Sequence, residues 1–401
     1  MAKKNRRSAF GPGFLVTAAF IGPGTVTTCT LAGADFGYAL LYALVFATVT
    51  TIILQEMTGR LSLGSGKDLG QALRDYSGHP VVRFLYIILT LSAVTLGCAA
   101  YEAGNIIGGS IGMEMITSIP QKVWVVLIAS AAVFILSRRA YRFVEKFLIY
   151  LVFIMSISFL ATFIIILPDL KSVLAGFVPS LPSHSLPLVL ALVGTTVVPY
   201  NLFLHSSAVR QKWSAPGDIK HVRKDLLVSI GLGGLISMTI VITSASAFFL
   251  RGMDVTSGAQ MAEQLKPLFG PLTNWLFGIG FFAAGMSSAV TAPYAAAFAS
   301  SGILGWDINT DSRRFRAVWL MVILAGLGVS LFRFNPISVI IFAQMANGII
   351  LPAASIFLLV VLNDRKKMGG MANDWKRNLA GITVIVIVSV LGAWNIFKLF
   401  L

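Results

Sequence analysis

The chain has 401 residues, of which 56% are hydrophobic and only 12% are charged, and its formal net charge is +15. A soluble protein would carry about 25% charged residues, so the composition excludes a soluble globular domain and indicates an all-α, polytopic membrane protein. The sequence has four histidines and two cysteines, and their spacing indicates neither a disulfide framework nor a zinc site. It contains no phosphate-loop or nucleophile-elbow motif of soluble enzymes. We therefore expect neither enzymatic activity nor a cofactor.

Eleven apolar runs are long enough to be membrane-spanning helices. The loops between them are too short to fold alone, so residues 1–401 are expected to form a single transmembrane domain. Small residues in two runs, between Gly104 and Gly112 and from Ala283 to Ser301, predict close helix–helix contacts. The expected spans are 13–32, 38–57, 83–108, 122–137, 146–167, 187–207, 226–250, 273–303, 317–332, 336–362 and 380–400.

Basic residues concentrate before the first span and after every second span. Arg60 and Lys67 follow the second span, for example, and Arg313 and Arg314 follow the eighth. This positive-inside pattern predicts a multi-pass protein of the plasma membrane or cell inner membrane, with residues 1–12 as a cytoplasmic tail and the C-terminus outside. Because topology accounts for the charge, the expected surroundings are the lipid bilayer, and no nucleic-acid partner is expected.

Two spans are interrupted at a proline, the first at Gly22-Pro23-Gly24 and the sixth at Val198-Pro199. An interrupted helix leaves backbone N–H and C=O groups without hydrogen-bond partners. Within the membrane such groups are tolerated only where a polar group, a solute or water can pair with them. A matched pair of interruptions indicates a solute site between two inverted repeats. We therefore expect residues 13–167 to form the first repeat, 187–362 the inverted second repeat, and 380–400 an extra eleventh helix.

Glu102 lies in the middle of the third span, and an ionisable residue at that depth indicates a function by default. The alternative is a structural role for a protonated or hydrogen-bonded side chain. His205, near the end of the sixth span, fits a proton relay and simple interhelical hydrogen bonding equally well.

Six motifs are spread over nearly the whole chain. They are Gly11 to Val16, Ala32 to Tyr38, Val198 to Ser207, Ala283 to Thr291, Gln344 with Leu351-Pro352, and Met368-Gly369 followed by Asn373. Together they resemble the Nramp family of divalent-metal transporters. The resemblance implies a LeuT-like fold of five plus five inverted helices with an eleventh, alternating access, and a site at the two broken helices. It also implies that Glu102 stands where the family has an acid linked to proton movement.

The chain departs from the family at the expected site. Where the family has Asp-Pro-Gly-Asn, this sequence has Gly22, Pro23, Gly24 and Thr25. The family's methionine in the sixth helix, a soft ligand for transition metals, is Val198 here. Its neighbouring histidine is replaced as well, by tyrosine, so the metal ligands of this chain are unknown. The candidate solute-binding residues are Ala19, Gly22, Gly24, Thr25, Val197, Val198, Tyr200, Asn201 and Gln344, and the candidate proton-linked residues are Glu102 and His205.

The sequence predicts a secondary transporter that works by alternating access. The resemblance favours a divalent cation, with proton symport as the candidate coupling. The altered site favours Mg²⁺ over Mn²⁺ or Fe²⁺, because Mg²⁺ needs only oxygen ligands and keeps several waters. A small organic solute or carboxylate is the alternative, because helix N-terminal amides at a neutral break bind carboxylates. A non-transporting sensor or scaffold is the third hypothesis, although no appended domain supports it.

Overall fold

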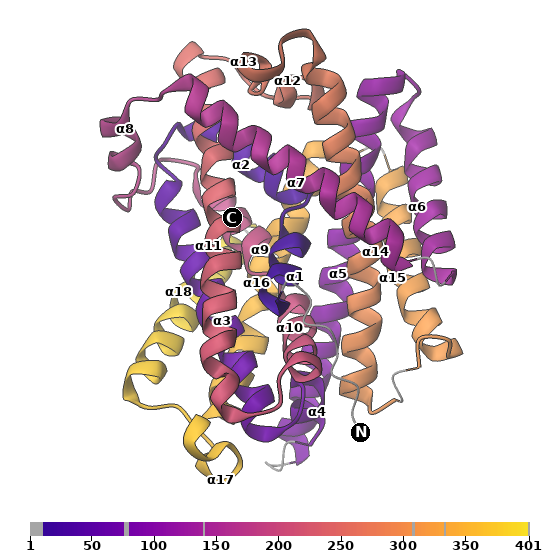
Figure 1. The fold of residues 1–401 in the computed structure, drawn as a ribbon, viewed down its shortest axis with the longest axis vertical. Helices are drawn as coiled ribbons and strands as arrows, with labels where there is room; N and C mark the ends of the chain where they lie inside the picture. Colours follow the sequence, from indigo (N-terminus) through magenta and orange to yellow (C-terminus); the bar gives the residue numbers. More distant parts are fainter. Residues whose placement is uncertain (1–10, 76–79, 139–140, 307–308, 333, 400–401) are drawn as a thin grey trace.

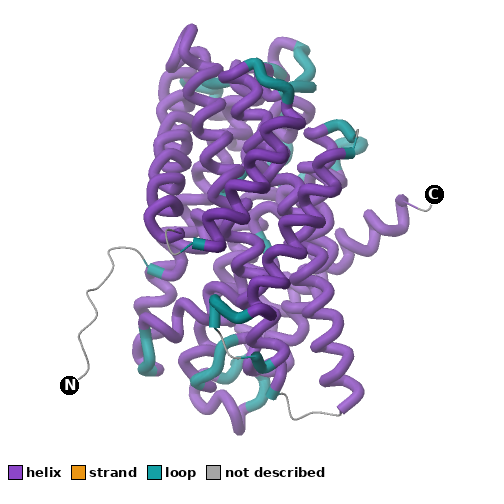
Figure 2. Tube along the Cα trace, turned by 90° about the vertical axis from the view of Figure 1, so that its right-hand side faces the viewer, coloured by secondary structure: helices purple, strands orange, loops and turns teal. Residues whose placement is uncertain are grey.

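Long helices run side by side along the longest axis of the protein in the computed structural model, which describes residues 11–75, 80–138, 141–306, 309–332 and 334–399 (Figure 1). This described part consists of helices and connecting loops and contains no strand. Seen from the side, the last turns of the chain lean away from the bundle (Figure 2). The predicted all-α class is therefore confirmed.

The first half of the chain holds one broken helix followed by four further long helices. A short helix, α4, lies at the end of the bundle that is lowest in Figure 1. The elements are α1 (Pro12–Phe20), α2 (Pro23–Phe36), α3 (Leu41–Ser65), α4 (Leu69–Arg74), α5 (Pro80–Thr117), α6 (Gln121–Ser137) and α7 (Tyr141–Ile166).

After the short helix α8, the second half has the same order of long elements, with a broken helix followed by four long helices, and it ends with an additional long helix. Its α-helices are α8 (Leu170–Ala175), α9 (Leu186–Thr196), α10 (Pro199–Lys212), α11 (Ile219–Ala247), α12 (Gly258–Glu263), α13 (Lys266–Phe269), α14 (Thr273–Leu304), α15 (Arg313–Leu331), α16 (Pro336–Leu362), α17 (Arg365–Met368) and α18 (Trp375–Leu399). Short 3-10 turns are η1 (Pro216–Asp218), η2 (Phe249–Arg251), η3 (Gly270–Leu272) and η4 (Gly369–Met371).

The helices match the predicted spans in number and order. Within the described residues, 9 helices are long and apolar enough to cross a membrane, with α9 and α10 counted together, and the bent pair α1–α2 makes a tenth. The remaining predicted span corresponds to α6, an apolar helix of 17 residues. Each expected span therefore coincides with a helix or a broken helix.

Several predicted spans were shorter than the helices, and the second and third ended too early by the largest margin. The second was expected to end at residue 57, but α3 continues to Ser65, so Arg60 lies inside this helix with 1% of its surface exposed, and not in a loop. The third was expected to end at residue 108, but α5 continues to Thr117. The glycines of α5 do not end this helix, because they allow it to pack closely against α14. A Cβ atom at Gly112, for example, would lie 2.6 Å from the Phe282 backbone nitrogen of α14.

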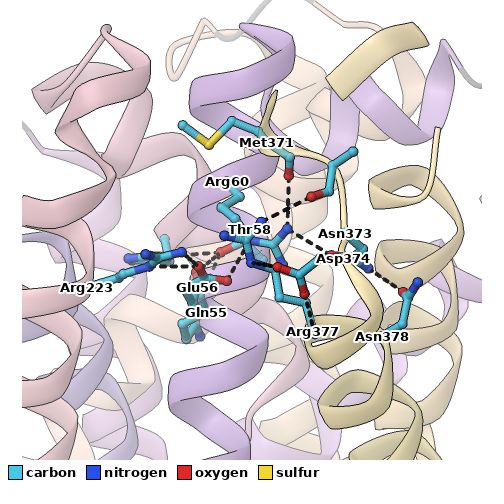
Figure 3. Close-up of polar contacts among 12 residues, drawn as sticks. Gln55, Glu56, Thr58, Arg60, Arg223, Met371, Asn373, Asp374, Arg377 and Asn378 are labelled. Carbon is cyan, nitrogen blue, oxygen red and sulfur yellow. Dashed lines mark hydrogen bonds and ion pairs between the residues drawn. The ribbon is translucent and has the colours of Figure 1, made fainter. Parts of the chain in front are cut away.

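A cluster of polar side chains joins α3, α11 and the segment before α18 (Figure 3). Glu56 accepts from Arg60 Nε at 2.7 Å and from Arg223 Nη2 at 2.8 Å. Arg60 Nη1 donates to Asn373 Oδ1 at 2.8 Å and to the Met371 carbonyl at 3.0 Å. We call Glu56, Arg60, Arg223 and Asn373 the Glu56 cluster. It gives the motif around Asn373 a structural role, which is to fix the start of the last helix against α3.

The short helices α12 and α13 lie at the opposite end of the bundle (Figure 1), and the buried side chain of Gln264, between them, links them to two long helices. Gln264 donates to Thr30 Oγ1 of α2 at 2.9 Å and accepts from Thr243 Oγ1 of α11 at 3.1 Å. Gln264 is fully buried, as are its neighbours Met261 and Leu265. The loop that carries these helices is therefore packed into the bundle and linked to the half-helix that follows the first break.

Candidate functional site

The first break lies at Ile21 and Gly22, between α1 and α2. Pro23 has no N–H group with which to continue the hydrogen bonds of α1. The two half-helices are bent by 59° relative to each other, and Gly22 has an extended backbone with φ −121° and ψ −173°. The last carbonyls of α1, including that of Ala19, and the first amides of α2, including that of Gly24, therefore have no partners within the helices.

The second break lies at Val197 and Val198, between α9 and α10. Their backbones are not helical, with φ −99° and ψ 76° at Val197 and φ −87° and ψ 123° at Val198. Pro199 again removes the donor that would continue the helix. Both predicted interruptions are thus present in the structure, and both valines are buried.

A pair of threonines joins the two broken helices. Thr25 Oγ1, at the start of α2, donates to the Phe20 carbonyl across the first break. The same oxygen lies 2.8 Å from Thr195 Oγ1, in the last turn of α9. The structure therefore brings the two breaks together, and the Thr25 hydroxyl is already engaged within the protein.

Gln344 of α16 lies between the two broken helices. A Cβ at Gly24 would collide with the Gln344 side-chain amide, and a Cβ at Gly194 would collide with the Gln344 carbonyl. Both glycines are therefore needed for this close approach. Gln344 Oε1 is buried and has no hydrogen-bond partner among the described residues.

Asn201, in the first turn of α10, is fully buried, and neither atom of its amide has a partner in the described part of the chain. Buried polar groups are almost always hydrogen-bonded in proteins. Asn201 and Gln344 together thus place free amide donors and acceptors beside the breaks, where a polar solute or water can meet them.

Helices α5 and α14 approach the first break at Gly22, and α10 packs against α5 beside it. A Cβ at this position would lie 2.9 Å from Ser288 Oγ of α14 and 3.8 Å from the Tyr101 hydroxyl of α5. The Tyr101 ring packs edge-on against Tyr200 of α10, with centroids 5.9 Å apart. The sequence analysis did not identify Tyr101 or Ser288 as site residues, because only tertiary packing brings them to the break.

A narrow hollow of about 10 Å³ opens beside Ala19, large enough for a single water. Ser287, Ser288 and Thr291 of α14 line its other side. The Ala19 end of α1 therefore faces hydroxyl groups of α14.

Glu102 is fully buried on α5, but it faces a different neighbour from Tyr101. A Cβ at Gly326 of α15 would lie 2.7 Å from Glu102 Cγ, so this glycine makes room for the acid. Glu102 Oε2 accepts from Asn105 Nδ2 at 3.3 Å, and Oε1 has no partner among the described residues. The structure thus places Glu102 against α15, one residue from a side chain that reaches the first break.

His205 is buried between α10 and α3. Its Nδ1 lies 2.9 Å from Thr58 Oγ1, and Thr58 donates its own proton to the Gln55 carbonyl at 2.8 Å. This arrangement assigns the donor role to Nδ1 and leaves Nε2 as an acceptor. Nε2 has no partner within the described residues.

The described residues contain no group of three or more His, Cys, Asp or Glu side chains that could hold a metal ion. Neither break carries a carboxylate or a thioether. An ion at the breaks would therefore be coordinated by carbonyl, amide and hydroxyl oxygens.

Two broken helices that face each other within a bundle of long apolar helices define a multi-pass membrane transporter of the LeuT-like fold. Solved structures of this class match nearly the whole chain. A variant of the manganese transporter of Eremococcus coleocola aligns with a TM-score of 0.78 at 20% identity, covering 96% of this chain and 85% of that one. MhsT in complex with L-phenylalanine aligns with a TM-score of 0.63 at 13% identity and covers 98% of each chain.

The chain belongs to the Nramp family, described as natural resistance-associated macrophage protein-like, which matches residues 13–398. The divalent metal cation transporter MntH of Nostoc sp. is 32% identical, over 97% of this chain and 90% of that protein. MntH of Listeria monocytogenes is 28% identical, over 97% of this chain and 89% of that protein. The resemblance found in the sequence motifs is confirmed.

Proposed function

We propose that this protein is a secondary transporter that moves a hard divalent cation of the Mg²⁺ type across the membrane by alternating access. The observation that carries the proposal is the pair of facing breaks, at which unpaired carbonyls and neutral side-chain oxygens converge. Its relatives are named as divalent metal cation transporters, which favours a cation. Oxygen ligands suit Mg²⁺, whereas the loss of the soft ligand at Val198 disfavours Mn²⁺ and Fe²⁺.

The proposed binding groups come from both breaks and from α16. We propose that oxygen atoms at the breaks coordinate the cation or accept hydrogen bonds from its water ligands. They are the backbone carbonyl oxygens of Ala19 and Val197 and the side-chain oxygens of Asn201 and Gln344. The other proposed site residues shape this site. Gly22 and Gly24 have no side chain, so Ser288 and the Gln344 amide can approach the first break closely. Thr25, Val198 and Tyr200 are the remaining proposed residues of the site.

A second candidate solute is a small organic carboxylate. The observation that favours it is the absence of an acid at either break, which leaves the first amides of α2 and α10 to meet an anion. The test is uptake of Mg²⁺, Mn²⁺ and a panel of small carboxylates into proteoliposomes that contain the purified protein. Saturable Mg²⁺ uptake is the expected result. Carboxylate uptake without metal uptake would replace the cation proposal.

Glu102 and His205 are the proposed proton-linked groups. Glu102 is buried at membrane depth with one unpartnered oxygen, and His205 presents an unpartnered Nε2. We expect Glu102→Gln to fold, because glutamine keeps the size of the side chain and its contact with Asn105. Solute uptake driven by an inward proton gradient should then lose its pH dependence. Uptake with the same pH profile as the parent would remove Glu102 from the coupling mechanism.

The proposed orientation places the end of the bundle with α4 and α17 in the cytoplasm, as the basic loops predict. The proposed repeats are residues 13–167 and 187–362, with 380–400 as the additional helix. The N-terminal tail was expected at residues 1–12, of which 1–10 lie outside the described residues. This orientation puts the C-terminus outside, and accessibility of a C-terminal tag in intact cells would test it.

A further inference from the structure

We infer that Ser288 and Tyr101 are binding residues of the solute site, and that their hydroxyl oxygens coordinate a hard cation in place of the carboxylate that position 22 lacks. The inference rests on the proposed function and extends it to two residues on α14 and α5. It also gives a role to the motif from Ala283 to Thr291, which contains Ser288.

The first argument is the position of the two hydroxyl groups relative to Gly22. A Cβ atom at position 22 would lie 2.9 Å from Ser288 Oγ and 3.8 Å from the Tyr101 hydroxyl oxygen. An acid at position 22 would therefore direct its carboxylate into the space that these two oxygens border. With glycine there, α14 and α5 supply the oxygens at the same place.

The Tyr101 hydroxyl is unpartnered within the described part of the chain, and Ser288 lines a hollow. Tyr101 is 1% exposed and its hydroxyl has no hydrogen-bond partner among the described residues. Ser288 is 3% exposed and lines the hollow beside Ala19. A buried hydroxyl without a partner loses free energy unless a ligand or a water fills its site. The two side chains thus mark a place where a solute gains hydrogen bonds or coordination.

The chemistry of these groups narrows the solute. Hydroxyl, carbonyl and amide oxygens are hard, neutral metal ligands. They suit Mg²⁺, which takes oxygen ligands and retains water. They offer neither the thiolate nor the thioether that favours softer metals. The first break, Ser288 and Tyr101 together form an oxygen-only site.

Cross-linking tests the geometry without reference to any solute. A Cβ at position 22 would lie 3.9 Å from Ser288 Cβ, which is within the range that disulfides bridge. In a protein with Cys29→Ala and Cys98→Ala, the pair Gly22→Cys and Ser288→Cys should form a disulfide under mild oxidation. The matched control pair is Gly22→Cys with Ser300→Cys. Ser300 lies on the same helix, is 1% exposed and also has an unpartnered hydroxyl, but it is about 18 Å further along the helix.

Transport kinetics test the binding role. Ser288→Ala and Tyr101→Phe should each raise KM for Mg²⁺ uptake about 5–10-fold while Vmax stays within twofold, because one neutral oxygen contact is lost. Ser300→Ala should leave KM unchanged. Gly22→Ala should push the Ser288 hydroxyl aside and raise KM equally, and the double variant Gly22→Ala with Ser288→Ala should be no worse than either single variant.

The outcomes separate this inference from the proposed function. If the cysteine pair fails to cross-link, or if Ser288→Ala and Tyr101→Phe leave KM unchanged, the inference is wrong even though Mg²⁺ transport stands. If the parent protein does not transport Mg²⁺, the proposed function is wrong. The inference is then tested by whether an added solute slows disulfide formation between the two cysteines. Slower cross-linking with a carboxylate of the panel would keep the two residues in the site but overturn their coordination of a cation. No protection by Mg²⁺ or by any carboxylate would overturn the binding role entirely.

Discussion

Replacing Glu56 by alanine should lower the free energy of unfolding by about 3–5 kcal/mol, because it removes the carboxylate that pairs with the buried Arg60 guanidinium. Arg60 is 1% exposed, and within the described residues its ion-pair partner is Glu56, at 2.7 Å. Without that partner, Arg60 would remain buried beside the second cation of the cluster, Arg223. Thermal melting of purified protein in detergent should show a decrease of several degrees.

The matched control is Arg223→Gln, which removes the exposed end of the same cluster. The Arg223 side chain is 46% exposed, so loss of its pair with Glu56 should cost less than about 1 kcal/mol. Equal destabilisation by the two substitutions would mean that burial of Arg60 does not set the stability of this end of the bundle. No destabilisation by Glu56→Ala would contradict the Glu56 cluster as an anchor for α18.

Asn201→Ala should raise KM for the transported solute about 10–150-fold, equivalent to about 1.5–3 kcal/mol, the range for a hydrogen bond to a charged group. The amide is fully buried, and both of its polar atoms are unpartnered among the described residues. A role in binding explains why such a group is retained at the start of α10. Uptake kinetics in proteoliposomes measure the change.

The control for Asn201 is Thr90→Val, which also removes a buried, unpartnered polar group. Thr90 is 2% exposed and precedes Tyr101 on α5 by about 16 Å along the helix. Its substitution should leave KM within twofold of the parent. An unchanged KM in Asn201→Ala, with normal expression and melting, would exclude Asn201 from the binding site.

Local sequence signals predicted the helices and the two interruptions. A proline within an apolar run removes one donor from the helix, and this effect at Pro23 and Pro199 does not depend on the rest of the fold. The length of α3 was less predictable, because Arg60 looks like the start of a polar loop. Its burial requires Glu56 one turn earlier and Asn373 far along the chain, and only the tertiary structure brings these groups together.

The candidate site was predicted in part. The residues beside the prolines follow directly from the breaks, and Gln344 followed from the family resemblance. Ser288 and Tyr101 carry no local signal, since a serine in a small-residue helix ordinarily serves packing. They reach Gly22 because glycines allow α14 and α5 to approach closely: a Cβ at Gly285 would lie 2.7 Å from the Asn105 carbonyl.

The central claim is that the facing breaks form a site with neutral oxygens and no acid, and competition between two metals in the uptake assay tests it most directly. We predict saturable Mg²⁺ uptake by the parent protein that micromolar Mn²⁺ does not inhibit. Inhibition by micromolar Mn²⁺, or saturable Mn²⁺ uptake at that concentration, would contradict the account.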